Sequence, residues 1–312
     1  KGKKTEKEKF AGGLYTTTLE AFIPTVGRGI QSCTSHCLGQ NFSKMFGIQF
    51  EGENREKQFA WQNSWGLTTR SIGIMVMIHG DNKGLVLPPR VAGIQVVIVP
   101  CGITSSLSAE EKAALHAAIQ SVETQLKQSG IKCRADFRDN YTPGWKFNDW
   151  ELKGVPIRIE MGPRDVKANK VVVVRRFDGV KKDFSMDGLN FAIKDEIEAI
   201  HAAMFEKAKQ EHDACMKTIH DWNQVLPALN QKCMVLIPFC CQSACEEDIK
   251  ESTKRQAVAS NPAEGSSDES VSLSMGAKSL CIPFEQPKMS ADQACLKCGK
   301  KAEAYCLFGR SY

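Results

Sequence analysis

One stretch of the chain reads Val91-Ala92-Gly93-Ile94-Gln95-Val96-Val97-Ile98-Val99-Pro100. It is rich in β-branched residues and apolar throughout, which is typical of a buried β-strand. A helix is predicted next, because Ser108-Ala109-Glu110-Glu111 has the pattern of a capping box and Gly130 is a stop signal. Between these signals, four apolar residues recur at helical spacing: Leu115, Ile119, Val122 and Leu126.

The residues that follow extend this pattern into an α/β unit. Two further strands are predicted at residues 156–161 and 170–176, and Asp178-Gly179 indicates a tight turn. From Phe191 to about Met216 we expect one long helix, and we expect Pro227 to end any continuation of it. Apolar residues on one face of that helix are Ile193, Ile197, Ile200 and Met204.

Bulk properties narrow the class of protein. With 312 residues the chain is long enough for two or three domains, and it has no run of about 18 apolar residues that would cross a membrane. Thirteen cysteines spread over a chain without a signal peptide favour a reducing, cytoplasmic compartment without disulfides. The net charge of +5 is compatible with a polyanionic partner but does not by itself indicate one. Residues 1–9 suggest a solvated charged lead-in, and residues 257–270 a mobile loop.

Two polar runs, at residues 31–44 and 62–70, have no amphipathic period but many hydrogen-bonding groups beside aromatic residues and glycines. Such runs usually line a site. The apolar stretch at residues 71–79 fits a buried helix or strand. If a helix begins near Thr69, Arg70 stands in its first turn, where it can meet an anion such as a nucleotide phosphate. An ion pair with a neighbouring carboxylate explains the arginine equally well.

Cysteines near the end of the chain form two close pairs, Cys240-x4-Cys245 and Cys295-x2-Cys298. Four thiolates supplied as two knuckles match a closed tetrahedral structural Zn²⁺ site, and free thiols are the alternative. Cys241 is adjacent to Cys240 and can replace it as a ligand. The cysteines better interpreted as packing residues are Cys33, Cys37, Cys233, Cys281 and Cys306.

Several motifs together resemble prolyl-tRNA synthetases of the eukaryotic and archaeal type. They are Tyr15-Thr16-Thr17-Thr18-Leu19-Glu20-Ala21-Phe22, Thr34-Ser35-His36, Gly39-Gln40-Asn41-Phe42-Ser43-Lys44, Gly66-Leu67-Thr68-Thr69-Arg70, Gly84-Leu85-Val86-Leu87-Pro88-Pro89-Arg90, Arg134-Ala135-Asp136, Pro143-Gly144-Trp145-Lys146-Phe147, Gly154-Val155-Pro156-Ile157-Arg158 and Gly309-Arg310-Ser311-Tyr312. The likeness covers nearly the whole chain and is weakest around residues 177–232 and 251–274.

The resemblance implies an α/β fold class with an α+β catalytic part. Residues 1–90 would be the C-terminal part of a class II catalytic domain, a remnant of its antiparallel sheet. Residues 91–200 would be an α/β anticodon-binding domain and residues 201–312 a small zinc-containing C-terminal domain. Only the third class II motif, around Arg70, is found, because no Phe-Arg-x-Glu pattern occurs. The chain therefore resembles the portion of the enzyme that begins after motif 2, and the family's homodimer would form through the missing N-terminal part.

The activity implied is that of a proline–tRNA ligase in protein biosynthesis, which activates L-proline with ATP and Mg²⁺ and transfers it to the 3′ end of tRNA(Pro). Neither step needs a covalent nucleophile, so we expect catalysis by positioning and charge neutralisation. Carried over from the family, the catalytic residues are Arg70 and His36, and the ATP-binding residues are Gln31, Thr68 and Arg70. The proline-binding residues are Phe10, Thr34, His36, Ser64, Trp65 and Gly66.

Charged and aromatic residues alternate in the presumed anticodon-binding part, and unpaired bases stack on such planes and hydrogen-bond to such carboxylates. For each residue taken singly, a solvated surface or an internal salt bridge is an equal alternative. The anticodon-binding candidates are Arg134, Asp136, Arg138, Trp145, Lys146, Glu151, Arg158, Glu160, Arg164 and Asp165.

Two other hypotheses remain at this point. The chain can be a non-catalytic tRNA-binding fragment or paralogue that lacks motifs 1 and 2, or its cysteine-rich end can be a redox-responsive or metal-responsive element. A Phe-Arg-x-Glu segment upstream in the parent reading frame distinguishes the first from the enzyme.

Overall fold

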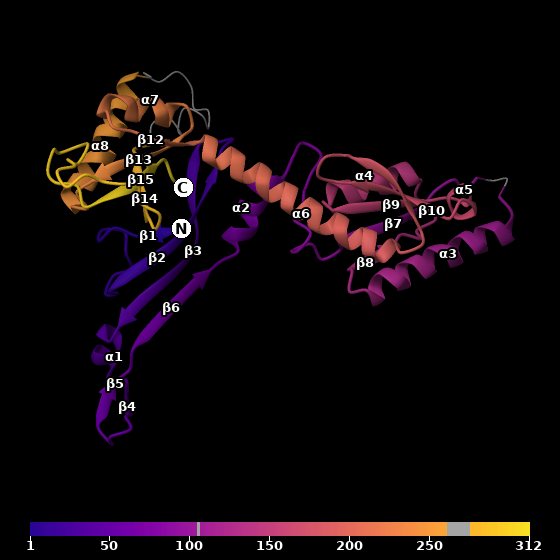
Figure 1. Ribbon diagram of the computed structural model, residues 1–312, viewed down its shortest axis with the longest axis horizontal. Helices are drawn as coiled ribbons and strands as arrows, with labels where there is room; N and C mark the ends of the chain where they lie inside the picture. The colour runs from indigo at the N-terminus through magenta and orange to yellow at the C-terminus, as the bar shows by residue number, and fades with distance from the viewer. Residues whose placement is uncertain (105–106, 261–274) are drawn as a thin grey trace. The chain divides into compact units, whose positions relative to one another are not determined.

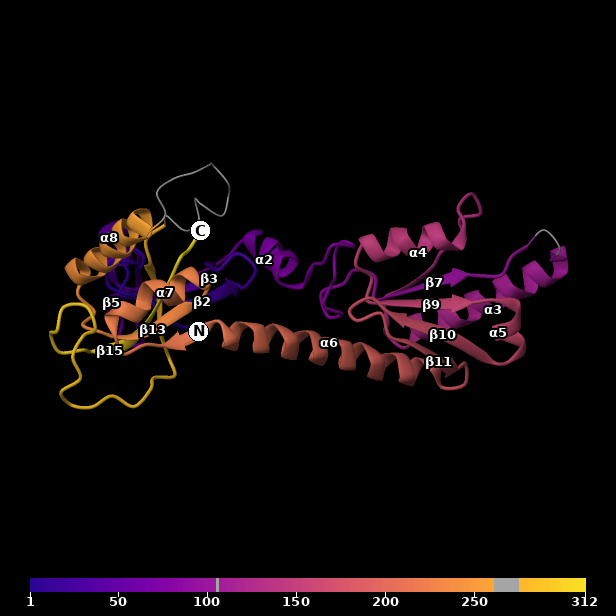
Figure 2. The same ribbon diagram turned by 90° about the horizontal axis from the view of Figure 1, so that it is seen from above.

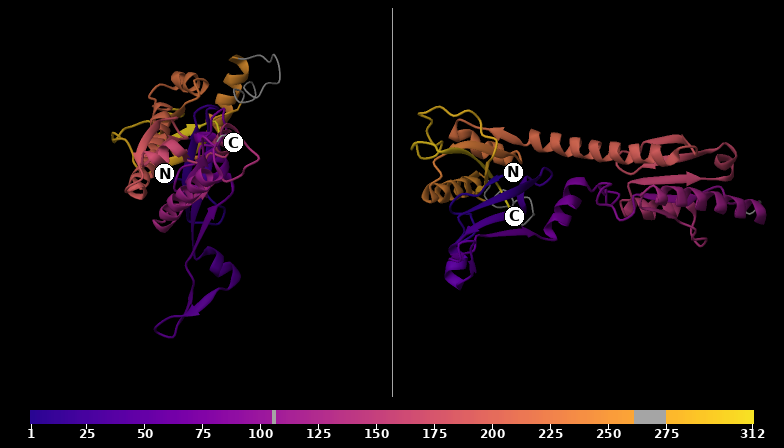
Figure 3. Two further views of the ribbon diagram at one scale, coloured as in Figure 1. Left: turned by 90° about the vertical axis from the view of Figure 1, so that its right-hand side faces the viewer. Right: turned by 60° about the horizontal axis from the view of Figure 1, so that its bottom comes forward.

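The computed structural model of the protein describes residues 1–104, 107–260 and 275–312. Residue contacts divide the chain into two compact units, one of which is discontinuous in the sequence. Unit 1 comprises Lys1–Ile74 and Gln210–Tyr312, and unit 2 comprises Met75–Lys209. Both chain ends therefore belong to unit 1 (Figure 3). The predicted division into three family domains, at residues 90 and 200, stays a prediction.

Unit 1 is built on an eight-stranded sheet with the strand order β12-β13-β15-β14-β1-β2-β3-β6 (Figure 1). Neighbouring strands are antiparallel except for the parallel pair β12 and β13. The strands are β1 (Gly2–Lys3), β2 (Tyr15–Ile23), β3 (Arg28–Gly39), β6 (Gln62–Leu67), β12 (Met216–Thr218), β13 (Met234–Phe239), β14 (Lys278–Pro283) and β15 (Ala304–Gly309).

Shorter elements complete unit 1. A hairpin of β4 (Gln49–Glu51) and β5 (Lys57–Phe59) lies beyond the ends of β3 and β6, next to α1 (Asn41–Phe46) (Figure 1). The other helical elements are α2 (Arg70–His79), which runs across the unit boundary, the 3-10 turn Trp222–Gln224, α7 (Val225–Asn230) and α8 (Ser243–Ser260). Around α7, β13 and β15 the core is apolar, with Phe239 and Phe308 edge to face at 5.3 Å.

Unit 2 is an α/β layer structure on a five-stranded sheet with the order β11-β10-β9-β7-β8. Its strands are β7 (Val96–Pro100), β8 (Cys133–Ala135), β9 (Ile157–Met161), β10 (Lys170–Arg175) and β11 (Lys181–Ser185). Strands β8, β7 and β9 are parallel, whereas β10 and β11 are antiparallel additions. The helices are α3 (Ala109–Gln128), α4 (Pro143–Leu152), α5 (Pro163–Lys167) and α6 (Leu189–Ala214), the last of which continues into unit 1.

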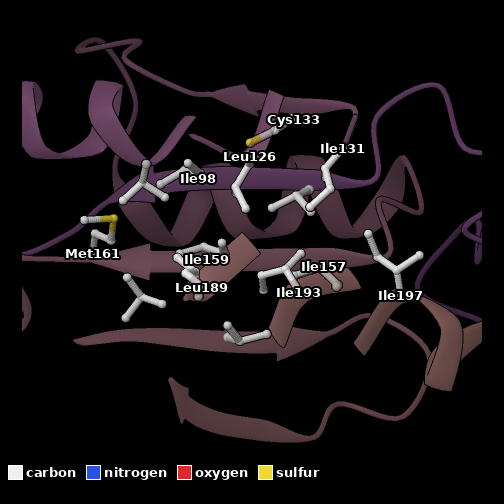
Figure 4. Packing of buried hydrophobic residues seen from close by; sticks show 14 of the residues in the cluster. Ile98, Leu126, Ile131, Cys133, Ile157, Ile159, Met161, Leu189, Ile193 and Ile197 are labelled. Carbon is white, nitrogen blue, oxygen red and sulfur yellow. The ribbon is translucent and has the colours of Figure 1, made fainter. Parts of the chain in front are cut away.

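Helices cover both faces of this sheet, as parallel strands require. On one face, Ile98, Ile157 and Ile159 pack with apolar side chains of α3 and α6 in a fully buried core (Figure 4). On the other face, Trp150 of α4 packs against Val97 and Val99. Figure 2 shows α4 and α6 on opposite sides of the strands.

The predicted capping box is confirmed, because Ser108 Oγ accepts from the Glu111 N–H and the Glu111 carboxylate accepts from the Ser108 N–H. The turn at Asp178-Gly179 is also confirmed: it joins β10 to β11, with Gly179 at φ +72°. Strand β7 begins only at Val96, because the N–H groups of Val91 and Ala92 turn back to the Pro88 carbonyl.

The long helix expected from Phe191 to about Met216 is confirmed, since α6 spans Leu189–Ala214. It does not continue toward Pro227, which lies in the first turn of α7, where no intrahelical N–H donor is needed. Two other predictions are wrong. Residues 1–9 are not a solvated lead-in, since Gly2–Lys3 is a strand and Lys4 and Thr5 are buried. Of the predicted loop at 257–270, residues 257–260 belong to α8 and the rest lies outside the described residues.

Candidate functional site

A row of hydrogen-bonded polar side chains crosses strands β2 and β3 on one face of the unit 1 sheet. The register pairs Thr16 with His36 and Thr18 with Thr34. His36 lies in the middle of the row: Nδ1 is 2.8 Å from Thr16 Oγ1, and Nε2 is 3.1 Å from Thr34 Oγ1. Because both ring nitrogens have partners, the imidazole is held in one orientation. The His36 imidazole is therefore a fixed hydrogen-bonding group within the row.

Phe10 extends the row at its outer side. Its ring centroid is 4.8 Å from that of His36, and its backbone N–H donates to Thr16 Oγ1 at 3.0 Å. The phenyl ring remains 45% exposed. Phe10, Thr16 and His36 thus form a rigid, partly open aromatic and polar wall.

A β-bulge brings Gln31 onto the same face. Between Leu19 and Glu20 the register shifts, so that Leu19 pairs with Cys33 but Glu20 with Gln31. Without the extra residue, alternation would place Gln31 on the opposite face from Thr34. With it, Gln31 Nε2 lies 3.4 Å from Thr18 Oγ1 and can donate to it.

The row ends on a buried ion pair. Thr18 donates to the Glu20 carboxylate at 2.5 Å, and Glu20 pairs with Lys4 at 2.8 Å. Both charged side chains are less than a tenth exposed. Lys4 also donates to the Leu280 carbonyl of β14. An unpaired charge would be very costly at this depth, so each member of the pair fixes the other.

Strand β6 lies next to β3 and contributes residues to both faces of the sheet. Ser64 pairs with His36 and Gly66 with Thr34, so both share the face of the polar row. Trp65 pairs with Ser35, points to the opposite face and is 77% exposed. A Cβ at Gly66 would be 3.2 Å from Thr34 Oγ1, so glycine leaves that hydroxyl accessible.

Arg70 and Thr68 lie where β6 leads into α2, which confirms that a helix begins near Thr69. Thr68 Oγ1 accepts from the Arg70 backbone N–H at 3.3 Å, and its carbonyl accepts from Ser71. The Arg70 side chain is exposed at the first residue of α2. No carboxylate in the described parts of the chain pairs with it, so the internal ion pair considered for this arginine is not seen there.

Four cysteine sulfurs meet at the edge of the unit 1 core. The sulfurs of Cys240, Cys245, Cys295 and Cys298 all lie within 4.8 Å of one another. Cys240 follows β13, Cys245 lies in the first turn of α8, and the other two precede β15. Sulfurs bound tetrahedrally to zinc at about 2.3 Å are about 3.8 Å apart. The distances of 3.6 Å for Cys240–Cys298 and 3.8 Å for Cys245–Cys295 fit that geometry.

Local backbone geometry selects these four sulfurs. Cys241 has φ +55°, which turns its Sγ toward the Phe239 carbonyl and away from the group. The group of four sulfurs therefore contains that of Cys240 and not that of its neighbour. Burial tends to raise the pKa of Cys298, but the Lys300 backbone N–H and the nearby thiols outweigh it and lower the pKa to about 7. Such a thiol supplies the thiolate that a metal requires.

Of the five cysteines expected to be packing residues, three are buried, whereas Cys33 and Cys37 are half-buried on β3. Cys233, Cys281 and Cys306 are all less than a tenth exposed. Cys281 and Cys306 belong to the apolar clusters around β13–β15.

In unit 2, one half of the anticodon-binding candidates surrounds Asp136, at the carboxyl end of β8. This buried carboxylate accepts from Trp150 Nε1 at 2.8 Å and from Arg138 Nε and Nη2 at 2.9 and 2.6 Å. Burial tends to raise the pKa of Asp136, but these hydrogen bonds outweigh it and lower the pKa to about 2. Lys146, also buried, donates to the Asp136 carbonyl at 3.0 Å. Asp136 and Lys146 therefore have a structural role, because their hydrogen bonds link the end of β8 to α4.

Exposed members of this half lie around that network. Trp145 is stacked on Tyr141 with ring centroids 3.8 Å apart, and the Arg138 guanidinium is within 5.3 Å of both rings. Arg134 lies over Trp150 at 5.8 Å. Flat aromatic and guanidinium surfaces of this kind are what unpaired bases stack on.

The second half of the candidates lies near β9 and α5. Arg158 pairs with Glu160 at 3.0 Å and lies over Phe147 at 4.1 Å, and Glu160 also pairs with Lys181. Glu151 pairs with Lys83 at 3.2 Å. Asp165 caps α5 by accepting from the Gly162 N–H, whereas Arg164 is exposed. The ten candidates therefore form two groups, one around Asp136 and the other near β9 and α5, and the members of each group contact different partners.

Comparisons with known proteins agree with this architecture. The family model described as anticodon binding domain matches residues 95–196, and the one described as prolyl-tRNA synthetase, C-terminal, matches residues 222–312. A putative proline–tRNA ligase of Saccharomyces cerevisiae is 52% identical over all of this chain and 45% of its own length. The cytoplasmic proline–tRNA ligase of Arabidopsis thaliana is 46% identical over all of this chain and 55% of its own length.

The chain belongs to the prolyl-tRNA synthetase family. A bifunctional glutamate/proline–tRNA ligase of Drosophila melanogaster, 49% identical over all of this chain, is matched over 18% of its length. The chain thus spans about half or less of the length of these relatives.

The structure brings most of the residues predicted to bind proline and the nucleotide onto one sheet face or next to it. Those on the face of the polar row are Thr34, His36, Ser64, Gly66 and Gln31, with Phe10 against them. Trp65 lies on the other face, and Thr68 and Arg70 follow at the start of α2.

Sequence reasoning missed the ion pair of Lys4 and Glu20 and the stacking partner Tyr141. Lys4 is one of several charged residues in the stretch 1–9, and no local sequence pattern indicates that it pairs with Glu20 of β2. Tyr141 could have been found, since it precedes Thr142-Pro143, a helix start with an N-cap and proline.

Proposed function

We propose that the protein containing this chain is a proline–tRNA ligase. It activates L-proline with ATP and Mg²⁺ to give prolyl-adenylate, then transfers the prolyl group to the 3′ end of tRNA(Pro). The observation that carries the proposal is the row Phe10–His36–Thr34 on one face of β3, with Arg70 at the start of the helix that follows β6, within a chain 46–52% identical throughout to three proline–tRNA ligases. Relatives from Drosophila melanogaster and Mus musculus are bifunctional glutamate/proline–tRNA ligases. The proposal is therefore compatible with a parent protein in which the ligase is fused to a second one.

In this proposal the row recognises the amino acid. The pyrrolidine ring packs against Phe10, and the Thr34 hydroxyl provides a fixed hydrogen bond to the charged nitrogen or the carboxylate. Because both ring nitrogens of His36 are bonded to Thr16 and Thr34, His36 orients the Thr34 hydroxyl toward the substrate and does not need to exchange protons. Ser64 and Gly66 complete the rim from β6, whereas Trp65 lies on the opposite face of the sheet and takes no part in it.

The nucleotide lies next to the proline. Gln31 and Thr68 contact the adenine and ribose region, and Arg70 neutralises charge on the γ-phosphate from the first turn of α2. Mg²⁺, when bound, offsets the charge of the phosphates. Gln31, Thr68 and Arg70 otherwise act by positioning the nucleotide, so that the proline carboxylate is in line with the α-phosphate.

The other parts serve tRNA and the fold. The exposed candidates of unit 2, including Trp145, Arg134 and Arg164, contact the anticodon, and the four-cysteine group holds a structural Zn²⁺. The parent protein acts as a cytoplasmic homodimer. In the described residues, no helix is both long and apolar enough to cross a membrane.

Proline-dependent pyrophosphate exchange tests the proposal in the full-length parent protein. Arg70→Ala should abolish the exchange, whereas Arg55→Ala, at an exposed arginine of the β4–β5 turn, should leave it unchanged. Near-normal exchange in Arg70→Ala refutes the assigned role. A wild-type protein that binds tRNA without exchanging pyrophosphate would support the non-catalytic alternative.

A further inference from the structure

The loop at residues 10–14 carries Phe10, the aromatic member of the candidate proline site. It contains two consecutive glycines, Gly12 and Gly13, which give the backbone many accessible conformations. The Phe10 N–H donates to Thr16 Oγ1, and the Phe10 carbonyl accepts from the Gly13 N–H, both at 3.0 Å. These bonds restrain the backbone of Phe10 but not its side chain, and the residue is 45% exposed. The position of the ring therefore depends on its other neighbours.

Helix α1 makes two contacts with this loop. The amide of Asn41 donates from Nδ2 to the Gly12 carbonyl at 2.8 Å. The next residue, Phe42, has its ring centroid 6.0 Å from that of Phe10, with an angle of 40° between the ring planes. Tilted aromatic rings at this separation attract each other. Asn41 therefore holds the loop backbone, and Phe42 holds the ring that the loop carries.

Glycine at position 12 allows the loop to lie directly on α1. Gly12 has φ +83°, and an added Cβ would lie 3.0 Å from Cζ of Phe42. The Phe42 ring is in turn stacked on Phe46, with centroids 6.4 Å apart. Since Phe10 also contacts His36 at 4.8 Å, ring contacts run without a break from α1 to the polar row.

The helix is anchored independently of the loop. Ser43 is buried and donates from Oγ to the Gln40 carbonyl at 3.0 Å. The Gln40 side chain donates from Nε2 to the Phe59 carbonyl of β5 at 2.9 Å. Directly before α1, the last residue of β3 is Gly39, which has φ +58° and turns the chain out of the sheet. Helix α1 is therefore a fixed support for the loop that contains the two glycines.

We propose that Asn41 and Phe42 are positioning residues for the amino-acid substrate, because they fix Phe10, and that they thereby favour proline over smaller amino acids. The inference rests on the proposed function and deepens it. Neither side chain needs to touch the substrate. A pyrrolidine ring packs along the Phe10 ring, whereas the methyl group of alanine reaches less of it. A mobile Phe10 therefore weakens the binding of proline more than that of alanine.

Amino-acid-dependent pyrophosphate exchange in the full-length parent protein measures this preference. In Phe42→Ala we expect the KM for proline to rise about tenfold, and the ratio of kcat/KM for proline to that for alanine to fall by a similar factor. The KM for ATP should stay within about twofold of the wild type, since none of the residues assigned to the nucleotide lies in the loop. Asn41→Asp keeps the size of the side chain but cannot donate to the Gly12 carbonyl, so it should change the KM for proline and the ratio in the same direction.

Two control variants and a second measurement separate positioning from folding. Phe42→Tyr keeps the ring and should behave as the wild type does, and Phe50→Ala removes an exposed ring from β4 and should leave every KM unchanged. Hydrogen exchange detected by mass spectrometry without substrates reports on the loop itself. Peptides covering residues 9–14 should lose protection in Phe42→Ala and Asn41→Asp but not in the two controls.

Loss of loop protection together with a selective rise in the KM for proline supports the positioning role. The proposal is overturned if the KM for proline changes less than about twofold while the loop loosens, if the loop keeps its protection, or if proline, alanine and ATP are affected equally. Absent exchange in the wild type contradicts the ligase function alone. The affinities of the same four variants for proline and alanine, measured by calorimetry, then decide: a fall in their ratio in Phe42→Ala supports the positioning role, and an unchanged ratio overturns it.

Discussion

Removing the charge of Asp136 should destabilise the β7–β8 region of unit 2 by a calculable amount. The hydrogen bonds from Arg138 and Trp150 lower the pKa of Asp136 from 3.8 to about 2. At about 1.4 kcal/mol per pKa unit, this shift corresponds to about 2 kcal/mol of folded-state stability at neutral pH. Asp136→Asn keeps an acceptor for Trp150 but not the negative charge that faces Arg138, so it isolates that contribution.

Hydrogen exchange detected by mass spectrometry measures the effect locally. The Asp136 N–H donates to the Ile98 carbonyl, which links the residue directly to β7. We therefore expect peptides covering residues 96–100 and 133–138 to lose about 2 kcal/mol of protection at pH 7. Asp139→Asn, in the same loop but exposed, is the matched control.

The pH dependence has a definite sign. Because the folded-state pKa is lowered, the stabilisation is complete above the unfolded pKa of 3.8 and is lost as pH falls through about 2. At pH 3 about half of it should remain in the wild type. Asp136→Asn should lack this component at every pH. A difference below about 0.5 kcal/mol between the variant and the wild type at pH 7 would show that the buried charge contributes little.

Three further outcomes are expected. Cys298→Ser should lower bound zinc from about one per chain, measured by elemental analysis, whereas Cys241→Ser should retain it; equal zinc in both contradicts the donor set. Gly154→Ala should lower the urea midpoint by the equivalent of about 1–3 kcal/mol. The reason is that Gly154 has φ +72° and an added Cβ would lie 2.6 Å from a backbone oxygen. The control is the same change at Gly144, where the added Cβ meets no atom within 4 Å and the effect should be nearly neutral. His36→Ala should reduce proline-dependent exchange at least tenfold in the full-length protein, and a change below twofold argues against its role.

Local signals allowed the elements of unit 2 to be predicted well. Ser108 and Glu111 cap α3 as their spacing indicates, and the apolar residues Leu115 and Ile119 lie in the core. Such interactions span three or four residues and are therefore visible in the sequence. Pro227 lies in the first turn of α7, because proline is compatible with the start of a helix as well as with its end.

Pairing between distant strands could not be predicted. Strand β1 has two residues and no hydrophobic period, yet Gly2 pairs with both Thr18 of β2 and Pro283 of β14. Nothing near Gly2 in the sequence specifies these partners. The sheet of unit 1 therefore emerged only from the structure.

The resemblance to a family indicated which residues form the candidate site, but not on which face of the sheet each of them lies. His36, Thr34 and Gly66 share a face by simple alternation, so their convergence was accessible from the sequence. Gln31 joins them only through the bulge next to Cys33, which no composition signal marks. Trp65 was expected with the others, but the same alternation places it on the reverse side.

The discontinuity of unit 1 affects how the chain is made. Strands β1–β3 leave the ribosome before unit 2, but β14, which must pair with β1, follows only after all of unit 2. At about 5–20 residues per second, that interval is on the order of tens of seconds. During it, the β1 edge has no neighbour and can pair with other nascent chains. The newly synthesised protein should therefore depend on chaperones in the interval, while unit 2, being continuous, can fold as soon as it emerges.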